Sequence, residues 1–425
     1  MAQVDFKEAV VTMESSIKAS DIIKQHGVHV VITGADHPTG LFTARSLVGC
    51  VSHITGITMN RNAPCCRSRV WNRLVVVDTI SETLTELLSL GVASQTQSVL
   101  FAAQDIVIKM ISDNREALAP YYRFVLPDRE VVNTLIDKGK FYDWAVTKGF
   151  SVPASSIVSN RKELNEVLGR GKYPMIIKPV VKNEVWDRKS SASKVYKIYS
   201  QSAYDCLSVD LLDLSPELLL QQWIPGGDED VWFCLVYMGR DGEVKGSYTG
   251  RKLLQWPIGQ GNTAAAVGEK NETVAELTGS IFRSVGFYGL GSLEFKRNVQ
   301  DGKYYIIEPT VGRNDYQSGI ALAGGLNLTA MASADAAGIC WHIDSKHKHV
   351  TWIDGEGALR SLWGGATIRE TRAIFFATLC SHPIAWSLLK ANDPFPFIAW
   401  VKKRVAYIIR NFGTILLRRI WIYRG

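Results

Sequence analysis

The segment YYIIEPTVGRN, residues 304–314, reads as an apolar strand that ends in a carboxylate. Glu308 is followed at once by Pro309 and Thr310, and soon after by Arg313. A carboxylate at the mouth of a buried strand costs free energy unless a positive group meets it. The sequence therefore predicts that Glu308 contacts either an arginine side chain or a metal ion.

This strand is the second of a predicted β-hairpin whose turn contains Asp301 and Gly302. A two-residue turn made of these residues would place Glu308 opposite Phe295, with Glu294 on the other face. A three-residue turn with Gly302 in the left-handed conformation would instead pair Glu294 directly with Glu308 on one face. Both registers are compatible with the sequence.

A direct pair of Glu294 and Glu308 would bring two like charges together, which is destabilising unless a cation lies between them or one is protonated. Mg2+ suits such a pair because it takes oxygen ligands and completes its shell with water and substrate phosphates. Mn2+ is the alternative ion. The competing interpretation is that the carboxylates form ordinary solvated ion pairs with Lys296 and Arg313.

Lys178 lies in a second apolar segment, YPMIIKPV, directly before a proline. An ammonium group buried there needs an anion, because an uncompensated charge costs several kcal/mol in an apolar environment. A phosphate group would serve. The alternative is a lysine at a strand end whose charged head reaches solvent.

The chain has 425 residues, of which 46% are apolar and 21% are charged, as in ordinary folded globular proteins. The length predicts about two or three domains. Only Cys65 and Cys66 of the seven cysteines are adjacent, so neither a disulfide framework nor a Cys-x-x-Cys metal motif is indicated. The first residues lack the layout of a signal peptide and no apolar run spans a bilayer, so we expect a cytoplasmic protein.

Strand and helix patterns alternate in the first part of the chain, as in HGVHVVITGADHPTGLFTARSLVGC, residues 26–50. Two later segments, each with an Asp-Gly turn, predict antiparallel hairpins. We therefore expect an α/β domain followed by an α+β domain.

The order of motifs along the chain resembles that of the ATP-grasp superfamily. The motifs are Asp137-Lys138 before a helix, GFSVP, YPMIIKP, LLLQQWIPGGDED, TGRKLLQWPIGQG, YGLGSLEFK, IIEPTVGRNDY and the late DPFPF. More narrowly, the chain is similar to the predicted carboxylate-amine ligase branch that includes enzymes like D-aspartate ligase. The resemblance covers about residues 28–398 and implies an ATP-grasp fold with an N-terminal Rossmann-like, pre-ATP-grasp domain.

The resemblance also implies a division of the chain into four parts. They are an N-terminal extension at residues 1–25, the Rossmann-like domain at 26–120, an ATP-grasp domain of two α+β subdomains that clamp ATP at 121–345, and a C-terminal segment with a basic amphipathic tail at 346–425.

For the nucleotide, the resemblance implies two phosphate-binding lysines, Lys138 and Lys178, with Lys140 as a rival for the first. It also implies a hinge whose backbone contacts adenine and an acidic residue that binds the ribose hydroxyls. These residues are Gln222, Trp223 and Ile224 for the hinge, and Asp228 or Asp230 for the ribose.

For the metal and the chemistry, the resemblance implies Glu294 and Glu308 as Mg2+ ligands. Thr310 stands where the family commonly has an asparagine ligand, so either Thr310 takes that place or Asn314 replaces it. The segment after Lys178 also departs from the family, because it lacks the usual glycine-rich loop, which Ser190, Ser191 and Ser193 could replace. The catalytic positive groups near the transferred phosphate would be Lys178, Arg251 and Arg313.

Such a site transfers the γ-phosphate of MgATP to a carboxylate, and an amine then converts the acylphosphate to an amide. The chain is therefore predicted to be an ATP-dependent carboxylate-amine ligase acting on an amino acid or small carboxylic acid. The amine acceptor would be a cell-envelope or polysaccharide precursor or another amino acid. The alternatives are an ATP-binding module without ligase activity and an ATP-grasp enzyme that passes the acylphosphate to a non-amine nucleophile.

Two other interpretations of the sequence are disfavoured. A dehydrogenase is not indicated because TGADHPTG, residues 33–40, has no G-x-G-x-x-G spacing. In the resembling family this domain helps to bind substrate, so His37 or Thr39 is a candidate contact. No nucleic-acid partner is expected, because no recognisable module accompanies the basic residues.

The C-terminal stretch FIAWVKKRVAYIIRNFGTILLRRIWIYRG, residues 397–425, mixes apolar and basic residues, and no acidic residue follows Asp393. This composition predicts an amphipathic helix through which residues 398–425 contact the inner face of an anionic membrane peripherally. The alternative is a helix packed on its own domain with its basic residues in solvent. Gly413 is a point at which the stretch could divide into two helices.

Overall fold

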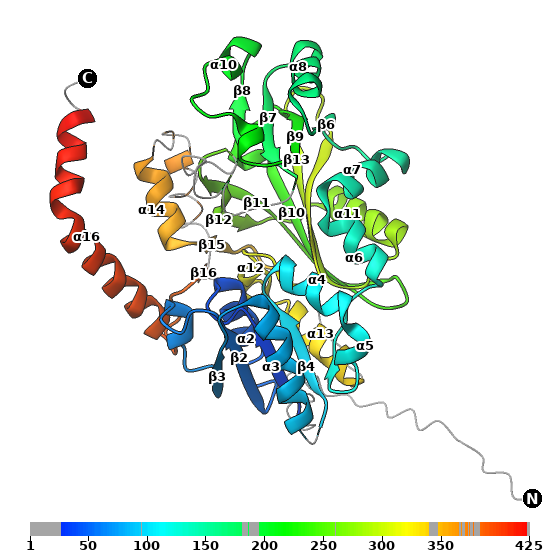
Figure 1. Cartoon of the computed structure of the whole chain (residues 1–425). Helices are drawn as coiled ribbons and strands as arrows, with labels where there is room; N and C mark the ends of the chain where they lie inside the picture. The colour runs from blue at the N-terminus through cyan, green and yellow to red at the C-terminus, as the bar shows by residue number, and fades with distance from the viewer. Residues whose placement is uncertain are drawn as a thin grey trace, which may run out of the picture.

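The computed structural model describes residues 27–94, 96–180, 186, 195–259, 261–339, 347–364, 367, 370–372, 374, 377 and 383–422, with residues 412–422 by backbone only. The predicted N-terminal extension and the three serines proposed to replace the glycine loop lie outside these ranges. Figure 1 shows a parallel sheet in the lower part of the molecule and two further sheets above it.

The N-terminal part is a five-stranded parallel sheet in the order β3-β2-β1-β4-β5. Its elements are β1 (His29–Thr33), α2 (Pro38–Ser46), β2 (His53–Thr58), η1 (Pro64–Arg67), β3 (Arg73–Val76), α3 (Ile80–Ala93), β4 (Ser98–Ala102), α4 (Asp105–Asp113), α5 (Arg115–Leu118) and β5 (Tyr122–Arg123). Val31 packs in one core with residues of α3 and α4, whereas Val30 and Ile32 pack in another with α2. Helices thus cover both faces, as predicted for a Rossmann-like domain. The sheet runs past the expected boundary at residue 120 because β5 pairs with β4.

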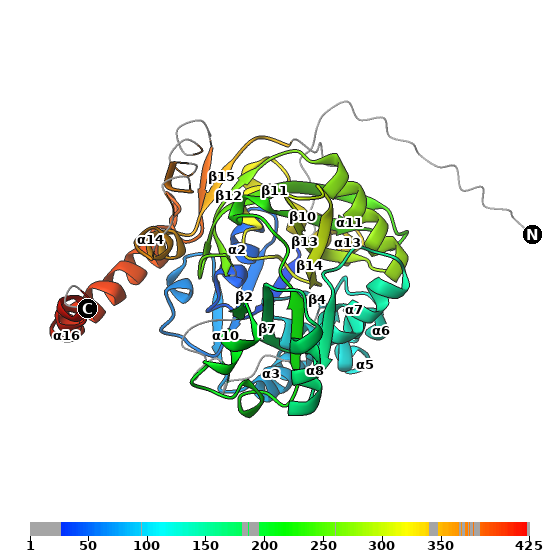
Figure 2. The same ribbon diagram turned by 90° about the horizontal axis from the view of Figure 1, so that it is seen from above.

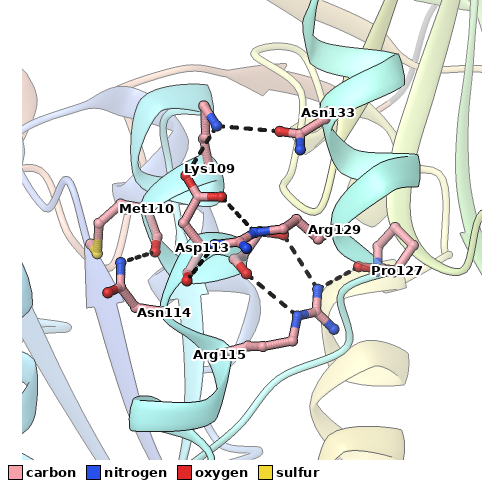
Figure 3. Close-up of polar contacts among 9 residues, drawn as sticks. Lys109, Met110, Asp113, Asn114, Arg115, Pro127, Arg129 and Asn133 are labelled. Atoms are coloured by element: carbon pink, nitrogen blue, oxygen red, sulfur yellow. Dashed lines mark hydrogen bonds and ion pairs between the residues drawn. The ribbon is translucent and has the colours of Figure 1, made fainter.

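A group of polar contacts joins this domain to the next helices (Figure 3). The Asp113 carboxylate at the end of α4 accepts from Lys109 Nζ at 3.0 Å and Arg129 Nε at 2.9 Å. Arg115 Nη2 donates to the Pro127 carbonyl at 2.6 Å. These bonds fix α4 and α5 against α6, the helix that leads into the second domain.

The next part forms a four-stranded antiparallel sheet in the order β6-β9-β7-β8. Its elements are α6 (Arg129–Ile136), α7 (Lys138–Thr147), β6 (Ser155–Val158), α8 (Arg161–Arg170), β7 (Met175–Pro179), β8 (Tyr196–Ile198), α10 (Gln201–Asp205), η2 (Leu211–Asp213) and β9 (Leu218–Gln222). Asp137 caps α7, because its Oδ1 accepts from the backbone N–H groups of Gly139 and Lys140 at 2.9 and 3.0 Å. The cap makes Lys138 the first residue of the helix.

The largest sheet has seven strands in the order β14-β13-β10-β11-β12-β15-β16. Its elements and the helices around them are η3 (Asp228–Asp230), β10 (Val231–Met238), β11 (Val244–Trp256), β12 (Asn262–Gly268), α11 (Glu272–Val285), β13 (Gly289–Arg297), β14 (Tyr304–Val311), α12 (Gly319–Ala323), α13 (Leu328–Ala337), β15 (Thr351–Ile353), α14 (Gly355–Trp363), β16 (Ile384–Trp386) and α16 (Phe395–Ile422). Strand β10 is buried along its whole length. The predicted combination of an α/β and an α+β part is confirmed.

Part of the predicted C-terminal segment belongs to this sheet, because β15 pairs with β12 and β16 pairs with β15. The chain then returns to the N-terminal domain through a buried ion pair. Arg45 Nη2 lies 2.8 Å from Asp393 Oδ2, and both side chains are less than a tenth exposed. Ser68 Oγ donates to the same oxygen at 2.5 Å, and Arg69 N donates to Asp393 Oδ1 at 3.2 Å. Asp393, the acidic residue of DPFPF, thus ties the C-terminal segment to the parallel-sheet domain.

The C-terminal tail is one helix, α16, which leaves the body of the molecule in both views (Figures 1 and 2). It runs without interruption through Gly413, so the predicted division at that glycine is wrong. Of the helices that the structure describes, none combines the length and the apolar character that crossing a bilayer requires.

Candidate active site

Glu294 of β13 and Glu308 of β14 lie directly opposite each other, so the predicted carboxylate pair is confirmed. The predicted three-residue turn is wrong. Asn298 N donates to the Lys303 carbonyl at 2.9 Å, which makes the turn longer. A β-bulge at Ile307 then shifts the register by one residue and brings the two glutamates together.

Two polar groups contact the Glu294 carboxylate. Lys252 Nζ of β11 donates to Glu294 Oε2 at 2.9 Å, and the Lys252 side chain is only 4% exposed. Gln317 Nε2 lies 3.5 Å from Glu294 Oε1. Burial raises the pKa of Glu294, and Asp315 and Glu308 add to this effect while Lys252 opposes it. A buried carboxylate among other acids provides an environment that stabilises a cation.

An open cavity lies between β7 and β9 of the four-stranded sheet, β14 and the helix α7. Lys138, Lys178 and Glu308 all line it, and Asp105 at the start of α4 lines it as well. Lys178 Nζ donates to Gln221 Oε1 at 3.3 Å. Both predicted phosphate-binding lysines therefore face the same space as one of the predicted metal ligands.

The predicted adenine hinge follows β9. The N–H groups of Gln222 and Trp223 donate to the backbone carbonyls of Ala154 and Pro174, at 2.8 and 3.0 Å. Lys197 Nζ lies 3.6 Å from the centroid of the Trp223 ring, and Ile224 is buried. These bonds tie the hinge to the starts of β6 and β7, the two strands that flank β9, and the contact of the hinge with adenine stays a prediction.

The two candidates for the ribose hydroxyls differ in environment. Asp228 is 2% exposed and accepts from Gln255 N at 2.7 Å, Gln255 Nε2 at 2.8 Å and Gly259 N at 3.1 Å. Both oxygens of the Asp228 carboxylate are therefore bonded to residues at or after the end of β11 and hold that end in place. Asp230 is partly exposed and accepts from Gly227 N at 2.9 Å. We therefore retain Asp230 and not Asp228.

Arg251 does not share a face of the sheet with the carboxylates. Cross-strand pairing places Arg251 beside Trp232 and Phe295, whereas Glu294 lies on the other face. Arg251 Nε pairs instead with Glu269 Oε2 at 2.7 Å. Lys252, the next residue in the chain, lies beside Glu294; the placement of Arg251 near the transferred phosphate stays a prediction.

Arg313 lies where the N-terminal domain meets β14. Its Nε is 2.5 Å from Asp105 Oδ1, and Asp105 lines the cavity. Burial lowers the pKa of Arg313, but Asp105 more than compensates and the pKa is raised. Arg313 therefore carries a full positive charge close to Glu308.

Thr310 lies two residues after Glu308 on the same face, opposite Ser292. Asn314, the alternative ligand, is 4% exposed and its Nδ2 donates to Thr43 Oγ1 and Thr329 Oγ1 at 3.0 and 2.9 Å. Its amide binds the helices α2 and α13, so Thr310 is the better placed of the two.

The donor set fits Mg2+ in type. Glu294, Glu308 and Thr310 offer hard oxygen atoms on one face, and a site with two carboxylates leaves positions for phosphate oxygens. Within the described part of the chain, no group of three or more His, Cys, Asp or Glu side chains has metal-binding geometry.

The carboxyl edge of the parallel sheet adds a feature that the motifs did not indicate. Thr33 Oγ1 and Asp36 Oδ1 are buried and have no hydrogen-bond partner among the described residues. His37 lies 2.9 Å from Gln104, next to the Asp105 that lines the cavity. Ligands of open α/β sheets bind at this edge.

Replacing Lys252 by methionine is expected to lower turnover at least about tenfold and stability by about 1–3 kcal/mol, because Glu294 would remain buried without its cation. Arg251→Met is the matched control, since its ion pair with Glu269 is partly exposed and should contribute less than about 1 kcal/mol. If the two variants lose the same factor in steady-state rate, Lys252 is not the cation that the site requires beside Glu294.

Comparisons with known proteins agree with this architecture. No family model matches the chain. D-aspartate ligase of Enterococcus faecium (strain Aus0004) is 22% identical over 245 residues, which are 56% of this chain and 58% of that protein. The match thus spans little more than half the length of this relative.

Solved structures are similar over more of the chain. The N5-carboxyaminoimidazole ribonucleotide synthetase purK, in complex with ADP, has a TM-score of 0.60 at 15% identity and covers 76% of this chain and 81% of its own. The biotin carboxylase domain of 2-oxoglutarate carboxylase from Hydrogenobacter thermophilus, a complex with MgADP, ADP and bicarbonate, has a TM-score of 0.56 at 14% identity, covering 75% and 72%. The arrangement of sheets predicted from the motifs is confirmed: this chain has the ATP-grasp fold.

Proposed function

We propose that this protein is an ATP-dependent carboxylate-amine ligase that forms an amide through an acylphosphate. The observation that carries the proposal is the shared cavity of Lys138, Lys178 and Glu308, with Glu294 directly opposite Glu308. Two ammonium groups and a carboxylate around one space, with a second carboxylate on the paired strand, suit a nucleoside triphosphate and its cation.

Each residue has a proposed role in this chemistry. Lys138 and Lys178 bind phosphate oxygens, and Glu294, Glu308 and Thr310 hold Mg2+, with Mn2+ as an alternative. When bound, the ion neutralises charge on the phosphates. Lys252 beside Glu294 and Arg313 near Glu308 supply further positive charge, together with Lys178.

The reaction has two steps. A carboxylate oxygen of the substrate attacks the γ-phosphorus, the bond to the bridging oxygen breaks, and ADP leaves. The amine nitrogen then attacks the acyl carbon, the carbon–oxygen bond to phosphate breaks, and the nitrogen loses a proton. Positioning and charge neutralisation provide most of the acceleration in such transfers.

The substrates belong to the same proposal. The acid is an amino acid or small carboxylic acid, and the amine acceptor is a cell-envelope or polysaccharide precursor. The orphaned oxygens of Asp36 and Thr33 favour the carboxyl edge of the parallel sheet as the place where a substrate ammonium group docks. We also propose that residues 398–425 contact the inner face of a membrane peripherally.

Release of ADP tests the reaction. We expect ADP to form when MgATP, the acid and the amine are all present, and hydroxylamine to replace the amine by trapping the acylphosphate as a hydroxamate. Binding of MgATP with no release of ADP for any acid would favour the module without ligase activity. A hydroxamate without any amide product across a set of amines would favour transfer to a different nucleophile.

A further inference from the structure

Helices α14 and α16 expose large apolar side chains on one side of the molecule. Trp363 of α14 is 80% exposed and Ile409 of α16 is 71% exposed, with Leu359, Tyr407 and Ile408 about half exposed. Both views show α16 leaving the body, with α14 as the neighbouring helix (Figures 1 and 2). Apolar side chains gathered in this way indicate an interaction surface and not scattered surface residues.

The carboxylate of Glu356 in α14 joins the two helices. Its Oε2 accepts from Trp400 Nε1 of α16 at 2.7 Å. Its Oε1 forms ion pairs with Arg404 of α16 and with Arg360 of α14. The hydrogen bond to Trp400 and the ion pair with Arg404 hold the first turns of α16 against α14.

Helical spacing places the exposed apolar residues next to this junction. Leu359 and Trp363 follow Glu356 by three and seven residues, so they share its face of α14. Tyr407 and Ile408 follow Trp400 by seven and eight residues and share the joined face of α16. Leu359 and Trp363 therefore form one surface with Tyr407 and Ile408, here called the α14–α16 surface, whereas Ile409, nine residues after Trp400, lies on the opposite side of α16.

The charged side chains that the structure describes on α16 are all positive. They are Lys402, Lys403, Arg404 and Arg410, and no acidic residue follows Asp393 in the sequence. Glu356 is already paired with two arginines. A second copy of the chain would bring like charges together, whereas an anionic bilayer is complementary to both the basic and the apolar side chains.

We infer that α14 and α16 together form a docking surface for an anionic lipid bilayer, with Leu359 and Trp363 of α14 entering the interface beside α16. The inference rests on the membrane contact proposed for residues 398–425 and extends it to a second helix. Docking of this kind needs neither ATP nor substrate, so it is independent of the ligase reaction.

The test is sedimentation of the full chain with vesicles of equal parts phosphatidylglycerol and phosphatidylcholine, compared with phosphatidylcholine alone, without nucleotide. We expect binding to the anionic vesicles only, weakened by salt, and a loss of about fivefold for each of Lys402→Gln and Lys403→Gln. The double variant Leu359→Ser/Trp363→Ser should weaken binding at least about tenfold. Val92→Ser, at a similarly exposed apolar residue of α3, should bind like the parent.

Three outcomes would overturn the inference. One is a parent chain that does not sediment with the anionic vesicles. Another is a Leu359→Ser/Trp363→Ser variant that melts and binds like the parent, which would leave α16 as the membrane contact without α14. The third is a parent dimer in size-exclusion chromatography that this variant converts to a monomer, which would make a second copy the occupant. MgATP binding, measured separately by thermal shift, reports on the ligase site whichever of these results is found.

Discussion

Replacing Glu308 by glutamine is expected to lower ATP-dependent turnover by about 10²–10³-fold while the protein stays folded. Glu308 lines the cavity with Lys138 and Lys178, and its side chain is exposed, so the substitution removes a proposed metal ligand at a position that solvent reaches. Glu294→Gln is less informative, because it would also strand the buried Lys252 ammonium.

The matched control for this prediction is Glu276→Gln. Glu276 is an exposed glutamate of α11, away from the cavity, and its replacement should leave turnover unchanged. Steady-state ADP release at saturating substrate provides the comparison. A Glu308→Gln variant that keeps more than about a third of the parent rate would rule out Glu308 as a metal ligand.

Replacing Asp393 by asparagine is expected to cost about 3–5 kcal/mol of unfolding free energy, because the Arg45 guanidinium would remain buried without its counter-charge. Denaturant unfolding of the parent and the variant measures the difference. Asp113→Asn is the control, since its pairs with Lys109 and Arg129 are exposed to solvent and should contribute less than about 1 kcal/mol. If the two variants lose similar amounts, the C-terminal segment does not depend on this ion pair.

The same pair gives the direction of a pH effect. Burial works to raise the pKa of Asp393, but the bonds from Ser68, Arg45 and Arg69 outweigh it and lower the pKa below its ordinary value. The Asp393 carboxylate is therefore protonated more readily in the unfolded chain than in the folded one. Its contribution to the free energy of unfolding is complete above the ordinary carboxyl pKa range and is lost as the pH falls through the lowered pKa. The difference between the parent and Asp393→Asn should accordingly shrink in strong acid.

Some of the site could be predicted from the sequence because it depends on local patterns. The Asp137 cap places Lys138 at the start of α7, and the apolar strand ending in Lys178 is continuous in the chain. The sequence allows two registers, one of which pairs Glu294 with Glu308, but it does not show what produces that pairing, because a bulge inside β14 leaves no signal as clear as a turn. The correct pair was reached through an incorrect turn.

The remainder depends on contacts between distant parts of the chain. Arg251 and Lys252 are adjacent, so only one can share a face with Glu294, and the choice requires the register of β10 with both of its neighbours. The partner of Asp393 is Arg45, on a helix near the other end of the chain. Tertiary packing alone determines such contacts. The motif DPFPF contributes to the family resemblance, but only the fold shows that its aspartate pairs with Arg45.

Thermal stability with and without MgATP tests the nucleotide site most directly, because it requires no knowledge of the acid or the amine. At about 100 times its dissociation constant, MgATP should stabilise the parent by about 2.7 kcal/mol, a shift of several degrees. Lys178→Ala and Glu308→Ala should each reduce that shift, and Lys140→Ala, at an exposed neighbour of Lys138, should not. A well-folded parent whose melting temperature does not change with MgATP would contradict the nucleotide site.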